Sequence, residues 1–165
     1  MEFRFRNLEI IDDQVAEMVA LRDEGKIAGI GLSTVGIEHL RRALPAGIAC
    51  VQNAYSVLER TDEPLLELCR EHGVAWVPYF PLGSAFPGIA KVTENNAVVG
   101  TAERLGATPA QVGLAWLLVH DQGLLLIPGT SSLAHLEENV AAGRVELDSE
   151  AMVLLDALGT PRHER

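Results

Sequence analysis

Apolar residues along the chain recur first at helical spacing and then in a short continuous run. Between residues 12 and 26, an apolar face at helical spacing follows an acidic start and ends near Gly25, which is typical of an amphipathic helix. The next run, residues 27–32, is short and apolar and leads into Ser33-Thr34, as expected for a buried strand that ends in a loop. The pattern therefore predicts a helix followed by a strand.

The same alternation continues to residue 158. Gly73 stands where a helix C-terminus is expected, and Thr108-Pro109 places a capping threonine before a proline at the first helical position. The pattern predicts strands over residues 48–52, 74–79 and 124–127, and helices over residues 37–43, 63–72, 96–105, 109–120, 132–142 and 149–158.

Four strand–helix units in succession imply parallel strands joined by right-handed crossovers. Such a chain forms either a doubly wound sheet or part of a (β/α)8 barrel. The glycine signatures GxGxxG, after the first strand, and GxxxxGK[ST] are missing, which favours the barrel. After Tyr79 comes a long segment with Pro81, Gly83, Pro87 and Gly88, which we interpret as a functional flap.

Composition and charge narrow the class of protein. The 165 residues, 48% of them hydrophobic, suffice for one sizeable core, so we expect a single domain over residues 1–165. The net charge of -10 disfavours binding to nucleic acid or to an anionic membrane. Cys50 and Cys69 lack metal-ligand spacing and are expected to be reduced packing residues. With no apolar run of signal or bilayer length, we expect a cytoplasmic protein.

Three motifs in order carry a resemblance to a known family. They are GIGLST at residues 29–34, VPYFPLGS at residues 77–84, and IPGTSS at residues 127–132 with LEEN at residues 136–139. Together they resemble the aldo-keto reductases, over about residues 12–158. The match corresponds to the second half of that family's barrel, so it implies half of a (β/α)8 TIM barrel, with about four parallel strands and surrounding helices. A whole barrel needs about 250 residues.

The resemblance implies a nicotinamide nucleotide site at the ends of the strands. Ser33 and Thr34 stand where the family usually has serine and asparagine bound to the nicotinamide carboxamide, Gln52 matches a glutamine bound to the same group, and Tyr79 matches an aromatic ring stacked on the nicotinamide. From the residues alone, Gln52 can instead satisfy a loop backbone, and Tyr79 can be a core residue. The residues that match the pyrophosphate loop are Phe80, Leu82, Gly83 and Ser84.

The last motif implies the adenosine end of the same site. Many members that prefer NADPH have lysine at the position of Gly129 and arginine at that of His135, so the resemblance implies NADP(H) and leaves NAD(H) open. Read alone, Ser131-Ser132 is an ordinary helix cap, and His135 a solvated surface residue. The residues that match the adenosine end are Gly129, Thr130, His135, Glu138 and Asn139.

The family's catalytic tyrosine, lysine, aspartate and histidine belong to the first half of the barrel. Here the tyrosines are Tyr55 and Tyr79, both within the second-half pattern, and the segment before Asp12 is too short for four strands. We therefore expect a truncated or split reductase of aldehydes and ketones that is inactive alone. An open half-barrel leaves strand edges and an apolar inner face exposed, so we expect a homodimer or a separately encoded first half as partner.

Two other functions remain open from the sequence. One is a non-enzymatic NAD(P)-binding or regulatory protein. The other is a different barrel enzyme that holds a phosphorylated substrate near Gly129-Thr130. Residues 85–96 carry no readable chemical signature, so the sequence leaves the carbonyl substrate open.

Overall fold

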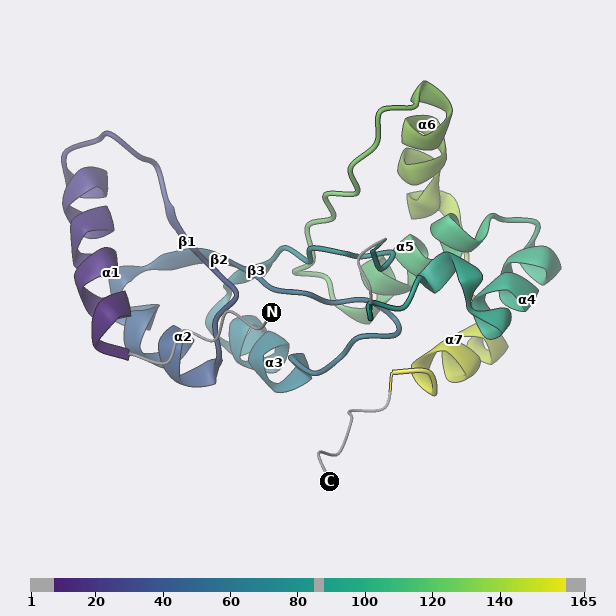
Figure 1. Cartoon of the computed structure of the whole chain (residues 1–165), viewed down its shortest axis with the longest axis horizontal. Helices are drawn as coiled ribbons and strands as arrows, with labels where there is room; N and C mark the ends of the chain where they lie inside the picture. Colours follow the sequence, from purple (N-terminus) through teal and green to yellow (C-terminus); the bar gives the residue numbers. More distant parts are fainter. Residues whose placement is uncertain (1–7, 85–87, 160–165) are drawn as a thin grey trace. The chain divides into compact units, whose positions relative to one another are not determined.

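The computed structural model describes residues 8–84 and 88–159 (Figure 1). The chain divides into two units. The first contains the chain up to Asn53 together with Asp62–Val77, and the second contains Ala54–Thr61 and the chain from Pro78 onward. The prediction of one domain over residues 1–165 stays a prediction.

The first unit is built on a parallel sheet of three strands. These are β1 (Ile30–Ser33), β2 (Ile48–Gln52) and β3 (Ala75–Trp76), in the order β1-β2-β3. Ile30 pairs with Ile48, but Gly31 pairs with Cys50, so Ala49 is an extra residue in β2. The shift places Ser33 opposite Gln52 and brings the C-terminal ends of β1 and β2 level with each other.

The two faces of this sheet differ in character. Ile30, Leu32, Val51 and Trp76 are buried on one face. The positions that alternate with them carry small or polar residues, where the sequence pattern predicted an apolar face. These positions are exposed or half-buried. Their small or polar side chains offer little apolar surface that another element would have to cover. They are Gly31, Ser33, Cys50, Gln52 and Ala75.

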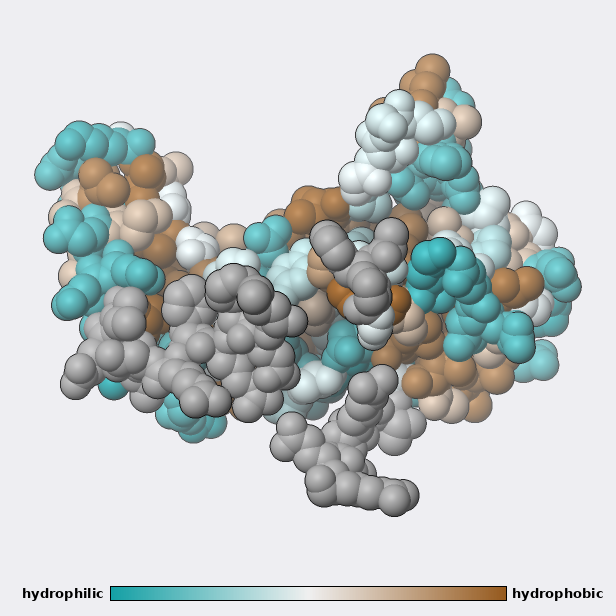
Figure 2. Space-filling view, viewed as in Figure 1, coloured by the Kyte–Doolittle hydropathy of each residue, from teal (hydrophilic) through white to brown (hydrophobic). Residues whose placement is uncertain are grey.

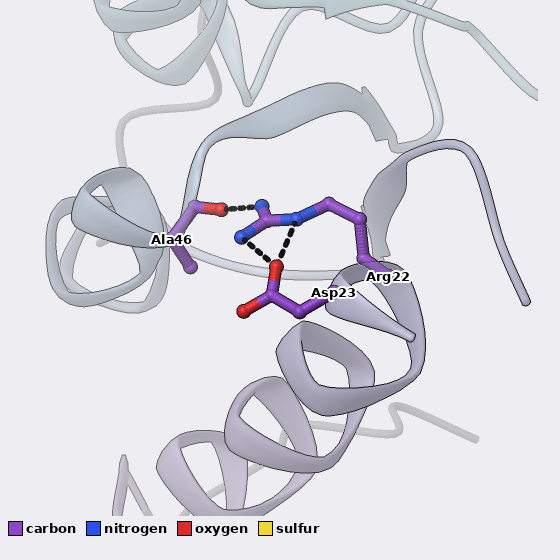
Figure 3. Close-up of polar contacts among 3 residues, drawn as sticks. All are labelled: Arg22, Asp23 and Ala46. Carbon is purple, nitrogen blue, oxygen red and sulfur yellow. Dashed lines mark hydrogen bonds and ion pairs between the residues drawn. The ribbon is translucent and has the colours of Figure 1, made fainter. Parts of the chain in front are cut away.

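Three helices accompany the sheet. They are α1 (Leu8–Asp23), α2 (Ile37–Ala43) and α3 (Glu63–His72), and α2 packs against both α1 and α3. The C-terminal end of α1 is fixed by Arg22, which donates a 2.5 Å hydrogen bond to the Ala46 carbonyl and forms an ion pair with Asp23 at 3.2 Å (Figure 3). Gly47 follows with a φ of 75°, so the turn leads directly into β2.

The second unit is helical. Its helices are α4 (Asn96–Leu105), α5 (Pro109–His120), α6 (Leu133–Ala141) and α7 (Ser149–Asp156). At the start of α5, the Thr108 hydroxyl accepts from the Gln111 amide, and the Gln111 side chain accepts from the Thr108 amide, which confirms the predicted cap. Residues 112–117 of α5 are buried without interruption, so α5 is the central helix of this unit.

An aromatic and cationic cluster holds residues 54–61 against α5 and α7. The Trp116 ring stacks on His120 at 4.4 Å between ring centroids, and the Arg60 guanidinium lies 4.6 Å from the Trp116 ring. The Trp116 indole donates to Asp156, and Arg60 donates to the carbonyl oxygen of Asp156. The Tyr55 hydroxyl lies 2.8 Å from the His120 imidazole. The cluster joins three segments that are distant in sequence.

Three predicted strands differ from the observed ones. The strand predicted over residues 27–32 is observed as β1, Ile30–Ser33. The strand predicted over residues 74–79 forms a regular ladder only along β3. Beyond β3, Pro78 has no amide hydrogen to donate, and pairing resumes as a single parallel bridge between Tyr79 and Ala54. The fourth strand, predicted over residues 124–127, forms no ladder within the part of the chain that the structure describes, and Leu125 is 57% exposed. An apolar run becomes a strand only where a neighbouring strand satisfies its backbone. The half-barrel therefore has three parallel strands instead of about four.

Most predicted helices agree with the structure. Those over residues 37–43, 63–72, 96–105 and 109–120 have the predicted limits, and Cys50 and Cys69 are free thiols, as predicted. In α5, Leu118 is 39% exposed, whereas Trp116 is buried. Among the described residues, no helix is long and apolar enough to span a bilayer, and no group of three or more acidic, histidine or cysteine side chains is arranged to hold a metal.

We expect the ion pair between α4 and α7 to make stability pH-dependent. Arg104 holds both carboxylate oxygens of Asp148, at 2.5 and 2.9 Å, and the Ala151 amide donates to the same carboxylate. The bond to Arg104, followed by the bond from Ala151, lowers the pKa of Asp148 from 3.8 to about 2. Because the pKa is lowered in the folded state, the stabilisation is present above pH 3.8 and is lost as the pH falls toward 2.

The variant Arg104→Met should therefore have a lower melting temperature than the wild type near neutral pH. This difference in melting temperature should shrink as the pH falls from 3.8 toward 2. Thermal unfolding followed by circular dichroism across the acid range measures it. Arg41→Met is the matched control, because Arg41 pairs with the exposed Glu38 within one helix. A difference in melting temperature that is constant down to pH 2 would contradict the assignment.

Candidate functional site

The ends of β1 and β2 carry three of the predicted site residues. The Thr34 amide donates to the Gln52 carbonyl at 2.9 Å, and the Ser33 and Thr34 hydroxyls lie 3.4 Å apart. Ser33 and Thr34 are exposed and Gln52 is half-buried, so these side chains are accessible to a ligand. The structure thus brings Ser33, Thr34 and Gln52 together at one end of the sheet.

Thr34 has an unusual backbone conformation. Its φ is 57°, in the left-handed region that a β-branched side chain rarely adopts. Such a residue persists only where its surroundings impose the conformation, and such positions are found mostly at functional sites. Asparagine, the residue that the resemblance leads us to expect here, tolerates this region better than threonine.

The second unit carries a pocket of about 330 Å3 lined by six predicted residues. They come from the turn after Pro78, from the segment before α6 and from α6 itself. Tyr79 lies in the pocket wall and is half-buried, whereas a core residue would be fully buried. The predicted residues that line this pocket are Tyr79, Phe80, Leu82, Gly83, Gly129 and Asn139, and Pro81, Ile127 and Pro128 complete it.

The turn at residues 80–83 is constrained by backbone geometry. Phe80 has a φ of 56° and Gly83 a φ of 81°, and the Gly83 amide donates to the Phe80 carbonyl at 2.9 Å. A Cβ atom on Gly83 would lie 2.0 Å from the Ala90 carbonyl oxygen. Glycine is therefore required at position 83 both for its φ and for the close approach of residue 90. The Phe80 ring meets the Tyr79 ring edge-on at 5.1 Å.

The start of α6 supports the cap interpretation of its hydroxyl residues. The Ser132 hydroxyl accepts from the His135 amide at 3.4 Å, and the Thr130 hydroxyl accepts from the Ser132 amide at 3.1 Å. Both hydroxyls therefore stabilise the turn into the helix. The His135 side chain is exposed. Gly129 is also exposed, and no atom lies within 4 Å of where its Cβ would be.

Glu138 contacts another helix. Its carboxylate accepts a hydrogen bond from the Thr108 hydroxyl, and its carbonyl accepts from the Gln111 side chain at 3.2 Å. These bonds hold α6 against the start of α5 and occupy part of the hydrogen-bonding capacity of Glu138. Within the second unit, the predicted residues that do not line the pocket are Ser84, Thr130, His135 and Glu138.

Asn53 is a polar residue that the sequence interpretation missed. It directly follows Gln52, is 4% exposed, and forms hydrogen bonds with the backbone of Val35 and the side chain of Asp62. Nothing in the residue pattern distinguishes Asn53 from a solvated loop residue. The only available signal is its position, because polar residues at the C-terminal end of a barrel strand are commonly functional.

Comparison with known proteins identifies the family. The model of the Aldo/keto reductase family matches residues 3–160. Among curated proteins, the chain is 39% identical to pyridoxine 4-dehydrogenase of Escherichia coli over 149 residues, which is 90% of this chain and 50% of that protein. It is 34% identical to probable aldo-keto reductase 1 of Glycine max, covering 85% of this chain and 48% of that protein. The chain thus spans about half the length of these relatives.

Solved structures give the same result. An aldo/keto reductase from Klebsiella pneumoniae in complex with NADP and acetate matches with a TM-score of 0.80 and 31% identity, covering 94% of this chain and 56% of the other. A thermostable aldo-keto reductase in complex with the inhibitor epalrestat matches with a TM-score of 0.79 and 32% identity, covering 90% and 55%. The partial barrel, the pocket beside Tyr79 and these matches lead to one conclusion: the chain belongs to the aldo-keto reductase family.

Proposed function

We propose that this chain is the cofactor-binding half of an NAD(P)H-dependent reductase of aldehydes and ketones. The observation that carries the proposal is the pocket that gathers Tyr79, Gly83, Gly129 and Asn139. Solved relatives in complex with NADPH and with NADP support a nicotinamide cofactor. In the proposal, Tyr79 binds the nicotinamide ring, the other residues of this pocket bind the pyrophosphate and adenosine, and Ser33, Thr34 and Gln52 bind the nicotinamide carboxamide.

The proposal assigns chemistry to each part of the pocket. The Tyr79 ring stacks on the nicotinamide, and its contact with the Phe80 ring limits its rotation. The close turn at Gly83 lets backbone groups and the neighbouring Ser84 approach the pyrophosphate. Thr130, His135 and Glu138 complete the adenosine end beside Gly129 and Asn139. Thr130 and Glu138 already have intramolecular partners, so their contribution to affinity is smaller.

We further propose that the chain lacks the residues for hydride transfer. In the aldo-keto reductases, by resemblance, the tyrosine that acts as general acid is assisted by a lysine that lowers its pKa. The lysines are Lys26 and Lys91, and each forms an exposed ion pair at 2.6 Å, with Glu24 and Glu94 respectively. Tyr55 is fully buried against His120. Neither tyrosine has the environment of a catalytic acid, so the chain is inactive alone.

A partner half is part of the same proposal. On α6, Leu133 and Val140 are 71% and 69% exposed, and Leu136, one turn away from each, is exposed on the same side. In Figure 2, hydrophobic residues are visible at the tip of α6, and the rest of its visible face is mostly intermediate or hydrophilic. A contiguous exposed apolar surface is typical of an interface. The proposed partner is either a second copy of this chain or a separate first half that supplies the catalytic residues.

A second candidate function follows because both lysines form exposed ion pairs and neither assists a tyrosine. A protein that binds NAD(P)H without a catalytic tyrosine and lysine can act as a nucleotide-binding or regulatory protein. The two functions differ in one measurable respect: addition of the amino-terminal half of a related reductase restores carbonyl reduction in the first case and leaves the protein inactive in the second.

The proposal is tested by fluorescence titration of the chain with NADPH and NADH, on a species whose oligomeric state is defined by size-exclusion chromatography. Saturable binding is expected, and Tyr79→Ala should weaken it by about 1 kcal/mol, which is about fivefold in Kd, because the stacking is lost. Phe80→Leu, at the adjacent ring, should have a smaller effect. Absence of binding at millimolar cofactor, or equal binding by Tyr79→Ala, would overturn the proposal.

Cofactor preference should change through Gly129. A side chain has free space at this position, and a lysine ammonium there can pair with the 2′-phosphate of NADPH. Gly129→Lys should raise the ratio of NADPH to NADH affinity by about tenfold, since a charge-assisted contact contributes about 1.4 kcal/mol. NADH affinity should stay unchanged, and Gly129→Met, with a similar length but no charge, should leave the ratio as in the wild type. An equal gain for both cofactors would contradict the assignment.

Replacing Thr34 with asparagine should raise the stability of the chain and its affinity for NADPH. Thr34→Asn relieves a β-branched residue of a left-handed φ and is expected to stabilise the chain by up to about 1 kcal/mol. It also adds an amide group beside the proposed carboxamide site, so NADPH binding should tighten. Thr34→Val keeps the branched shape and the strain and should show neither gain. Thermal unfolding and NADPH titration measure both effects, and a lower melting temperature for Thr34→Asn would show that the φ carries no cost.

A further inference from the structure

Asn53 forms three side-chain hydrogen bonds just beyond the β1–β2 ladder. Its side-chain oxygen accepts from the Val35 amide at 3.1 Å, and its side-chain nitrogen donates to the Val35 carbonyl at 2.8 Å. The same nitrogen donates to the Asp62 carboxylate at 2.8 Å. Asn53 is 4% exposed, and its two bonds to Val35 are buried, whereas its bond to Asp62 is only part-buried.

The pair of bonds to Val35 continues the ladder with a side chain in place of a strand. The last backbone bond between the two strand ends runs from the Thr34 amide to the Gln52 carbonyl. One residue further on, the carboxamide of Asn53 presents one acceptor and one donor to the backbone of Val35, as a paired strand would. Only a carboxamide offers both groups in one plane at this distance from the main chain.

The contact with Asp62 fixes the orientation of this carboxamide. If the amide were turned over, its oxygen would face both the Val35 carbonyl and the Asp62 carboxylate, and three acceptors would meet without a hydrogen. Asp62 itself starts α3, since its carbonyl accepts from the Leu65 and Leu66 amides. Asn53 therefore connects the start of α3 to the segment that follows β1.

These bonds impose the conformation of Thr34. Its own amide is held by Gln52, and the next residue, Val35, is held at both backbone groups by Asn53. A left-handed φ at a β-branched residue persists only when its neighbours determine it in this way. The direction of the Ser33 and Thr34 hydroxyls, and the exit of the chain after Gln52, thus depend on one buried side chain.

We propose that Asn53 is a positioning residue for the nicotinamide end of the cofactor site. The inference rests on the proposed function. Asn53 acts through the backbone: it holds Ser33, Thr34 and Gln52 in the arrangement in which they bind the carboxamide, without touching the cofactor itself. Loss of Asn53 lowers affinity for the nicotinamide half of the cofactor and leaves the adenosine half unaffected, because the pocket of the second unit involves none of its partners.

The test compares two probes on the whole chain. NADPH engages both ends of the site, whereas 2′-phospho-ADP-ribose carries the adenosine and pyrophosphate but no nicotinamide. For Asn53→Ala, we expect the Kd for NADPH to rise on the order of tenfold, from the loss of a buried hydrogen-bond network, and the Kd for 2′-phospho-ADP-ribose to stay within about twofold. Asn53→Asp should show the same two changes in Kd. Its carboxylate has no hydrogen to donate, so an oxygen would face the Val35 carbonyl and the Asp62 carboxylate without a hydrogen bond.

The control removes a comparable bond elsewhere in the same unit. Arg22→Met deletes the bond from Arg22 to the Ala46 carbonyl and destabilises the unit without touching the strand ends (Figure 3). It should change neither Kd. If the Asn53 variants fail to fold, Asp62→Ala, which removes the contact that fixes the amide but spares both bonds to Val35, should give a smaller loss of NADPH affinity, about threefold, with the same selectivity.

The outcomes separate the inference from the proposed function. If the wild type binds both probes and the variants lose both equally, or lose neither, Asn53 is only structural and the inference is overturned. If the wild type binds neither probe, the proposed function fails and the inference with it. If the variants weaken NADPH alone, the nicotinamide end depends on Asn53 as proposed.

Discussion

The hydrogen bond between the Thr34 amide and the Gln52 carbonyl closes the β1–β2 ladder, and the arrangement of the first unit's site residues depends on it. That bond requires the extra residue in β2. With Ala49 unpaired, Ser33 lies opposite Gln52, whereas an unshifted register would place Ser33 opposite Val51, whose side chain belongs to the buried face. One inserted residue therefore decides whether two polar side chains share a face of the sheet.

The fold was predictable where local sequence determines local structure. The helix caps at Thr108 and Gly73 follow from residue type, and both helices have the expected limits. The strands were harder to predict, because pairing depends on a neighbour that the sequence pattern does not show. Pro78 was visible and shortens β3, but the exposed segment after Leu124 has the same apolar pattern as a true strand.

The candidate site also has features that were predictable from the sequence and features that were not. Tyr79 and Gly83 were identified from a motif, and the structure places both at one pocket. The backbone conformations of Thr34 and Phe80 were not predictable, since neither residue type favours a positive φ. The bonds of Asn53 depend on residues 9 and 18 positions away, so no local pattern contains them. Chemistry carried by side-chain type was thus readable, and chemistry carried by backbone geometry was not.

The open environment of Gly129 has a consequence for how this protein can evolve. A side chain at position 129 meets no neighbouring atom, so exchange of this residue requires no repacking and little change in the free energy of unfolding. Gly83 is the opposite case, because any side chain there collides with the backbone at Ala90. Natural selection can therefore vary the charge at one end of the pocket freely while the turn at the other end stays fixed.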